Sequence, residues 1–194
     1  MEYIKIDNTL ERNPGVRVVL TSACALAAAG ALWQMGADLA TWLALLIPAI
    51  GWPILAHWLT RRSSASDGND VVLAVVDGAI VGAWVALVHF NLAASAVMLM
   101  VLVHSAYALH SARHAVLGIA GAIAGLAMTG VATSFAIQNN TSNATIWGCL
   151  LGMGLYLAAQ GVVTGRLLQT LAHKEQMLTV LRRVEFPLAV PFIL

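Results

Sequence analysis

Four polar side chains stand inside long apolar stretches of the sequence: Asp77, His57, His104 and Gln160. A charged residue in the hydrocarbon core of a membrane is costly, and it usually faces a bundle interior with a partner. Asp77 lies about two turns into its helix, and His57 and Gln160 lie within about two turns of the basic residues at the same surface. His104 is somewhat deeper, and we expect the four to form one polar layer. Such a layer could hold the helices together, or it could respond to a ligand or a proton.

Metal, haem and covalent chemistry have little support in the sequence. His110 and His114 have an i, i+4 spacing, but no Cys, Asp or Glu joins them, whereas a structural metal site usually needs four ligands. A haem would need facing histidines, for which His57 and His104 are the only plausible choice. No phosphate-binding loop and no nucleophile with its base is visible. We therefore predict no catalytic residue, no metal and no cofactor.

The elements that carry these residues are predicted to be membrane helices. The 194 residues are 60% hydrophobic and 10% charged, with a mean hydropathy of +0.82. In soluble domains about a quarter of the residues are charged, so this composition indicates an integral membrane protein. It gives no support to nucleic-acid binding.

Six stretches are long and apolar enough to cross a membrane. The expected spans are 16–33, 39–60, 71–90, 92–110, 115–137 and 146–171. A break near Asn91 is required, because residues 71–110 as one helix would be about 60 Å long, twice the hydrocarbon thickness. The predicted fold class is thus all-α, an integral membrane bundle of six transmembrane helices.

The ten Lys and Arg residues all lie before or at the start of the first span, or at the end of or after an even-numbered span. The positive-inside rule then places both termini in the cytoplasm. We expect a cytoplasmic N-terminal segment at 1–15, the transmembrane domain at 16–171, and at 172–194 a cytoplasmic extension of the sixth helix followed by an apolar tail.

Glycines at helical spacing suggest close helix packing. Gly121 and Gly125 lie four apart in the fifth span, and Gly161 and Gly165 lie four apart in the sixth. Small residues let helix backbones approach each other within one bundle, or between two copies of a chain. Both interpretations remain open, and the second would make these glycines part of a dimer interface.

The order of several short features resembles the second type of bacterial membrane-associated sensor domain. These features are Arg12-Asn13-Pro14-Gly15, Leu32-Trp33, Trp52-Pro53 with Ala56, Arg61-Arg62-Ser63, Asp77, Trp84-Val85-Ala86-Leu87, and Phe90-Asn91-Leu92 with Ser95. The resemblance covers about residues 12–174. It implies the N-terminal membrane part of a diguanylate cyclase or a class III adenylate cyclase, and it implies a homodimer, because such cyclases act across two subunits.

The chain contains neither the Gly-Gly-Asp/Glu-Glu-Phe signature of a diguanylate cyclase nor an adenylate cyclase domain. We therefore expect a sensory domain, not an enzyme, that passes a lipophilic or intramembrane signal through the sixth helix to a cytoplasmic cyclase output. Its partners would be the bilayer, a lipophilic small molecule and a second copy. Two alternatives are a small proton or cation transporter, which predicts flux in liposomes, and a ligand-free anchor, which predicts indifference to added lipids.

Overall fold

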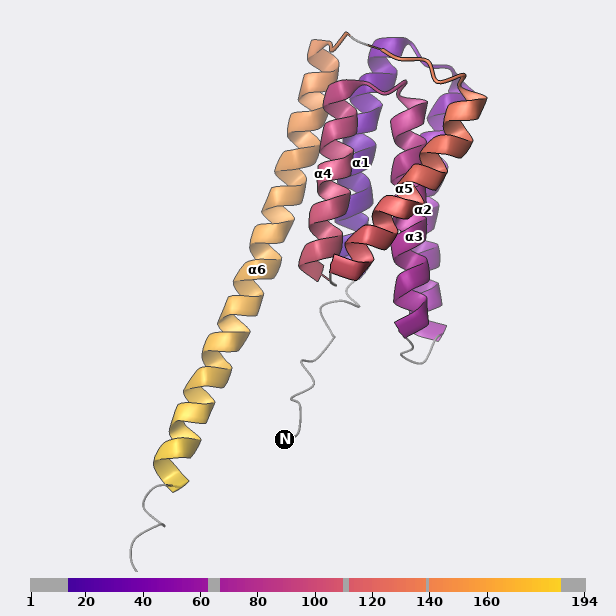
Figure 1. The fold of residues 1–194 in the computed structure, drawn as a ribbon. Coiled ribbons are helices and arrows are strands. Elements are labelled where there is room, and N and C mark those ends of the chain that lie inside the picture. The colour runs from indigo at the N-terminus through magenta and orange to yellow at the C-terminus, as the bar shows by residue number, and fades with distance from the viewer. Residues whose placement is uncertain (1–13, 63–66, 110–111, 139, 186–194) are drawn as a thin grey trace, which may run out of the picture. The chain divides into compact units, whose positions relative to one another are not determined.

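The fold is entirely helical in the part of the chain that the structure, a computed structural model, describes: residues 14–62, 67–109, 112–138 and 140–185. These residues form six α-helices and no strand, as the sequence predicts (Figure 1). The helices are α1 (Pro14–Met35), α2 (Leu39–Arg62), α3 (Asp67–Leu87), α4 (Leu92–Leu109), α5 (Ala112–Ala132) and α6 (Asn143–Glu185).

The chain divides into two compact units, Met1–Tyr156 and Leu157–Leu194. The first unit contains α1 to α5 and the beginning of α6, and the second contains the remainder of α6. The first unit therefore holds every helix that positions Asp77.

Five helices are long and apolar enough to cross a membrane. The qualifying parts are Arg17–Met35, Leu39–Arg62, Asp70–Leu87, Arg113–Ala132 and Asn143–Gly165. The searched part of α4, Leu92–Ser105, is apolar but shorter. α6 continues well beyond its apolar part to Glu185, as expected for a sixth helix with an extension.

Helix ends explain the break that the sequence requires. α3 ends at Leu87 and α4 begins at Leu92, so the turn around Asn91 is confirmed. The backbone N–H of Phe90 donates to the carbonyl of Val85, and that of His89 donates to the carbonyl of Ala86, which is a Schellman motif with His89 left-handed at φ 50°. Asn91, fully buried, then caps α4 by accepting a hydrogen bond from the backbone N–H of Ala94.

The same motif closes α1 and α5. Gly36 takes the left-handed position after α1 at φ 61°, and Ser134 takes it after α5 at φ 54°. Because Ser134 and Phe135 both leave the helical region, α5 ends at Ala132, and the expected span to residue 137 is too long. The ring of Phe135 stacks on that of Phe90, with centroids 6.2 Å apart, so the two turns lie together.

α3 and α5 are in backbone contact through small residues. A Cβ added at Gly78 would collide with the backbone of Gly118, and one added at Gly82 would collide with Ala122. Such contacts between membrane helices depend on small side chains, which let the backbones approach. The glycine beside Asp77 therefore holds α5 against the helix that carries this carboxylate.

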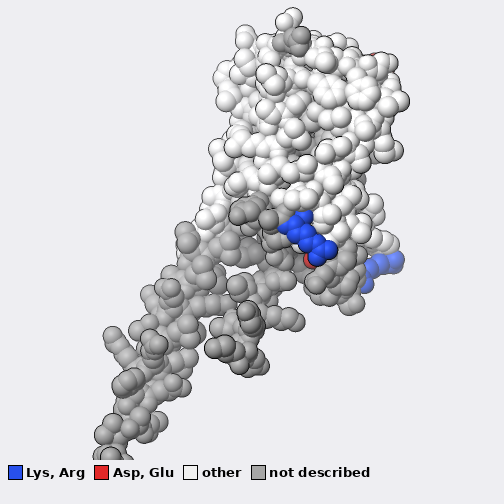
Figure 2. Space-filling view, in the orientation of Figure 1, with Lys and Arg blue, Asp and Glu red and all other residues white. Residues whose placement is uncertain are grey.

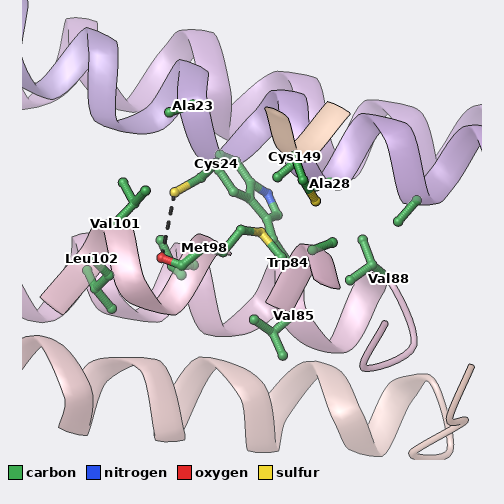
Figure 3. Packing of buried hydrophobic residues seen from close by; sticks show 14 of the residues in the cluster. Ala23, Cys24, Ala28, Trp84, Val85, Val88, Met98, Val101, Leu102 and Cys149 are labelled. Carbon is green, nitrogen blue, oxygen red and sulfur yellow. Dashed lines mark hydrogen bonds between the residues drawn. The ribbon is translucent and has the colours of Figure 1, made fainter. Parts of the chain in front are cut away.

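The largest fully buried side chain of the core is Trp84 of α3. Figure 3 shows it among Cys24 of α1, Met98 of α4 and Cys149 of α6. The thiol of Cys24 lies 3.9 Å from the carbonyl oxygen of Met98, and both cysteines are free and buried. These cysteines pack as small apolar residues, as expected from their apolar surroundings in the sequence.

Basic residues mark one end of the first unit. α1 to α5 run alternately up and down in Figure 1, so the start of α1, the end of α2 and the start of α5 lie at the same end. These segments carry Arg17, Arg61 with Arg62, and Arg113. On the face seen in Figure 2, the blue side chains lie toward this end and the opposite end has none. The positive charge is therefore asymmetric along the bundle.

Candidate functional site

Asp77 joins three helices. Its Oδ1 accepts a hydrogen bond from the indole Nε1 of Trp52 in α2 at 2.5 Å. Its Oδ2 accepts one from Nε of Arg17 in α1 at 3.2 Å, which is also an ion pair. We refer to Arg17, Trp52 and Asp77 as the carboxylate junction. It places α1 and α2 at fixed positions against α3.

Local sequence explains why these side chains meet. Arg17 lies one turn inside α1, so its side chain is held beside the bundle rather than in a terminal segment. Trp52 and Ala56, one turn apart, form the face of α2 that packs with Leu73 of α3. Leu73 and Asp77 are also one turn apart, so the same α2 face that buries Trp52 reaches the carboxylate.

The junction is largely closed to solvent but not completely. The side chain of Asp77 is 11% exposed and that of Arg17 is 19% exposed. The guanidinium compensates the charge of the carboxylate, and the indole N–H donates to its other oxygen. Removing one charge of such a pair leaves the other buried and uncompensated, which is typically more destabilising than replacing both. Either residue is therefore sensitive to substitution and to a competing ion.

The described hydrogen bonds of Asp77 come from Arg17 and Trp52. They do not come from His57, His104 or Gln160, which were expected to share its polar layer. In α2, His57 lies five positions after Trp52, about 140° around the helix, so the two side chains face different directions. The half-buried His57 accepts a hydrogen bond from the Thr60 hydroxyl at its backbone carbonyl, 2.9 Å away. Gln160 belongs to the second unit of the chain.

His104 forms a separate pair with Tyr156. The two are 2.6 Å apart between Nδ1 and the hydroxyl oxygen, and their rings meet edge to face with centroids 5.7 Å apart. Tyr156 is buried at 4% exposure, whereas His104 is exposed. This pair fastens the beginning of α6 to α4 and is not directed at the carboxylate.

Sequence reasoning missed Arg17 and Trp52 as partners of Asp77. In the sequence Arg17 counts among the basic residues that determine the orientation, and Trp52 enters only through the Trp52-Pro53 feature of the family resemblance. The signal that could have found Arg17 is its place after Pro14, a residue favoured in the first turn of a helix, which puts the arginine inside the helix.

A second polar cluster at the opposite end was also missed. Gln34 of α1 donates from Nε2 to the carbonyl of Asn140 at 2.7 Å, and its Oε1 accepts from the Thr145 hydroxyl at 2.6 Å and from the Ser142 backbone N–H at 3.0 Å. The Asn91 amide also donates to the Asn140 carbonyl, at 3.3 Å. These bonds fasten the connection between α5 and α6 to the rest of the bundle.

The four candidate packing glycines fall into two groups. Added Cβ atoms at Gly121 and Gly125 would collide with the backbone of Val75 and Ala79 in α3. These two glycines therefore serve packing within the chain. At Gly161 and Gly165 an added Cβ would meet no described atom within 4 Å. That pair remains a predicted dimer contact.

The candidate metal pair, His110 and His114, lies only partly within the described residues. His114 lies in α5, while His110 is outside the described residues. Among the residues that the structure describes, no three His, Cys, Asp or Glu side chains are grouped as metal ligands.

Comparison with known families gives one match. Residues 12–100 match the MASE2 domain, a membrane-associated sensor domain found in cyclases. The match includes all three residues of the carboxylate junction and confirms the resemblance read from the sequence. Searches of curated proteins and of solved structures gave no match. The apolar helices and the match indicate a multi-pass membrane protein, in which residues 12–100 are similar to a sensory membrane domain.

Proposed function

We propose that this chain, whose residues 12–100 belong to the MASE2 domain family, senses an intramembrane or lipophilic signal and passes it to a cytoplasmic nucleotide-cyclase output. In this proposal the protein lies in a bacterial inner membrane with six spans and with both termini in the cytoplasm. The signal acts at the carboxylate junction, and the long sixth helix carries the response.

The observation that carries the proposal is the burial of an ion pair between three helices of the matched segment. Asp77 has one donor on α1 and another on α2. A ligand that favours one of these contacts over the other would change the relative positions of α1, α2 and α3. A ligand shifts such an equilibrium only by its differential affinity for the two arrangements, and about 1 to 3 kcal/mol changes the output by 5-fold to 150-fold.

The contact between α1 and α6 supplies a route out of the junction. A Cβ added at Gly148 would lie 2.7 Å from the carbonyl oxygen of Leu26, and one at Gly152 would lie 2.5 Å from that of Ala23. A Cβ added at Gly30 of α1 would likewise lie 2.7 Å from the carbonyl oxygen of Ala144 in α6. Because backbones in such contact cannot slide independently, a displacement of α1, which carries Arg17, would move the beginning of α6.

α6 has the length that transmission needs. Beyond the apolar part that ends at Gly165, the helix continues from residue 166 to Glu185, about 30 Å at 1.5 Å per residue. A continuous helix transmits a rotation or translation of its first turns to its last. An output domain following this helix would receive the motion directly.

A homodimer is part of the proposal, because cyclases of the implied class act across two subunits. The open positions at Gly161 and Gly165 favour α6 as the contact. Cysteine substituted for Gly161 should then form a disulfide-linked dimer in membranes. Cysteine at Val163, about 200° around the helix, should not.

The test joins a diguanylate cyclase domain to the chain after Glu185 and compares wild type with Asp77→Asn in membrane vesicles. Asparagine still accepts from the indole of Trp52 but leaves the Arg17 charge uncompensated, so cyclase activity should change at least 5-fold. Asp38→Asn, at an exposed carboxylate outside the junction, is the matched control. Equal activity of all three at equal protein levels would remove Asp77 from signalling.

A further inference from the structure

The guanidinium of Arg17 is only partly used by the protein. Its Nε donates to Asp77 Oδ2, and neither terminal nitrogen hydrogen-bonds with any residue that the structure describes. A guanidinium has five N–H donors in a rigid fork that matches the two oxygens of a carboxylate or phosphate. Asp77 takes one of these donors, so the two terminal nitrogens, which bind anions best, have no acceptor among the residues that the structure describes.

The position of Arg17 gives a ligand access to that fork. The residue lies near the start of α1, at the end of the first unit where Arg61, Arg62 and Arg113 also lie. Its side chain is 19% exposed, although the carboxylate it contacts is 11% exposed. A molecule anchored in the bilayer with its polar group at the basic surface can therefore reach the guanidinium without entering the core. Several arginines at one end also raise the local concentration of anions.

We propose that the terminal nitrogens of Arg17 bind the anionic headgroup of a membrane-dissolved amphiphile, with Asp77 as the internal competitor for the same cation. The ligand class is an apolar chain that ends in a carboxylate or phosphate. This inference rests on the proposed sensory function and names the chemistry of its signal.

Competition for one cation gives the site a regulatory property. When an external anion binds the fork, it draws the guanidinium away from Asp77 and repels that carboxylate. Asp77 keeps its second donor, the indole of Trp52, so the contact that weakens is the one between α1 and α3. Ligand binding would thus loosen α1 while α2 stays joined to α3. α1 is also the helix in close contact with the beginning of α6.

The experiment measures binding of radiolabelled oleate and of oleyl alcohol to the whole chain in phosphatidylcholine nanodiscs. The variants are Arg17→Gln, Arg17→Lys, Asp77→Asn and, as a matched control, Arg113→Gln, which removes an exposed arginine at the same end. We expect a saturable oleate site, weakened at least tenfold in Arg17→Gln and less in Arg17→Lys, which keeps the charge without the fork. Asp77→Asn removes the internal competitor, so oleate affinity should rise about tenfold. Arg113→Gln should stay within twofold, and oleyl alcohol should bind all variants equally.

A second arm identifies the source of the headgroup. In nanodiscs that contain phosphatidylglycerol, lower oleate affinity in wild type but not in Arg17→Gln assigns the site to an anionic phospholipid. Unchanged affinity assigns it to a free fatty acid. Gel filtration and thermal melting show whether each variant is folded. If Arg17→Gln does not fold, oleate binding by Arg17→Lys decides the test.

Two results would overturn the inference: oleate affinity unchanged in folded Arg17→Gln, or affinity lowered rather than raised in Asp77→Asn. These results are separate from the fate of the sensory function. If Asp77→Asn alters cyclase output while oleate affinity is unchanged, the inference fails and the function stands. If affinity shifts as expected while output is constant, the site stands and the function fails.

Discussion

The backbone conformation of His89 is costly for a residue with a side chain. His89 and Phe90 both have positive φ, 50° and 55°, at the end of α3, and Ser134 and Phe135 repeat this after α5. A non-glycine residue in the left-handed region costs about 1 to 2 kcal/mol. The Schellman hydrogen bonds within each turn and the stacking of Phe90 on Phe135 between the turns offset that cost.

Exchanging glycine at these turns should change stability in opposite directions. His89→Gly relieves the left-handed strain, so we expect the free energy of unfolding to rise by up to about 1 kcal/mol. Gly36→Ala introduces the strain at φ 61° without a steric clash, since no described atom lies within 4 Å of the added Cβ, and should lower stability by about 1 kcal/mol. Thermal melting in detergent measures both, and the same sign for the two variants would contradict the explanation.

Asp38 provides a test of pH dependence outside the spans. Its Oδ1 accepts hydrogen bonds from the Thr41 hydroxyl and, at 3.1 Å, from the Thr41 backbone N–H, which caps α2. These bonds, the hydroxyl first, hold the pKa of Asp38 below its usual value. A carboxylate with a lowered folded pKa contributes stability above its unfolded pKa of about 3.9 and loses it as the pH falls through the folded value.

The difference in melting temperature between wild type and Asp38→Asn isolates this contribution. Asparagine also caps helices but cannot ionise, so the melting temperature of wild type minus that of Asp38→Asn should be constant at neutral pH and should fall below about pH 4. Melting curves from pH 7 to pH 2.5 measure it. A melting temperature of wild type that rises relative to that of Asp38→Asn on acidification would contradict the assigned direction.

At the scale of elements, glycines decide which helices touch. α3 and α5 meet along Gly78, Gly82, Gly121 and Gly125, whereas α1 and the beginning of α6 meet along Gly30, Gly148 and Gly152. One glycine contact thus holds α3, which carries Asp77, against α5. The other holds α1, which carries Arg17, against the beginning of α6. The carboxylate junction joins α1 to α3, so in the proposed mechanism a change there would act on both pairs of helices.

Alanine substitutions separate the packing glycines from the open ones. Gly125→Ala forces the backbones of α3 and α5 apart and should cost about 1 to 3 kcal/mol. Gly161→Ala adds a methyl group where no described atom lies within 4 Å and should leave the stability of the single chain unchanged or raise it by up to about 1 kcal/mol. Thermal melting of monodisperse protein measures both, and a larger loss in Gly161→Ala would reverse the assignment.

At the scale of the whole molecule, charge asymmetry is the basis of the proposed orientation. The described arginines near the helix ends cluster at one end of the first unit, and the opposite end carries the uncharged cluster around Gln34 and Asn140. The positive-inside rule assigns the basic end to the cytoplasm.

Thiol labelling tests that orientation in intact cells. Cysteine at Asn140 should react with a membrane-impermeant maleimide before lysis, and cysteine at Arg62 should react only after permeabilisation. Both positions are exposed, and wild type is the control because Cys24 and Cys149 are buried. Labelling of Arg62→Cys in intact cells would invert the proposed topology.

The sequence by itself determined the helices, the break at Asn91, the charge asymmetry and the resemblance to the sensor-domain family. Each depends on local composition: apolar length sets a span, and an overlong apolar run demands a turn. Span ends were less certain, as α5 shows, because Ser134 and Phe135 stop the helix through a motif that their residue types do not favour.

Only the tertiary structure decided what Asp77 binds and which glycines pack. Depth along a helix can be counted from the sequence, but direction around the helix matters equally, and His57 faces away from the side of α2 that presents Trp52. Arg17 became a partner because α1 packs beside α3, a contact between residues 60 positions apart in sequence. Gly121 and Gly161 each precede a second glycine by four positions, yet an added Cβ would meet the backbone of Val75 at Gly121 and no described atom within 4 Å at Gly161. This difference depends on tertiary packing, which the spacing does not encode.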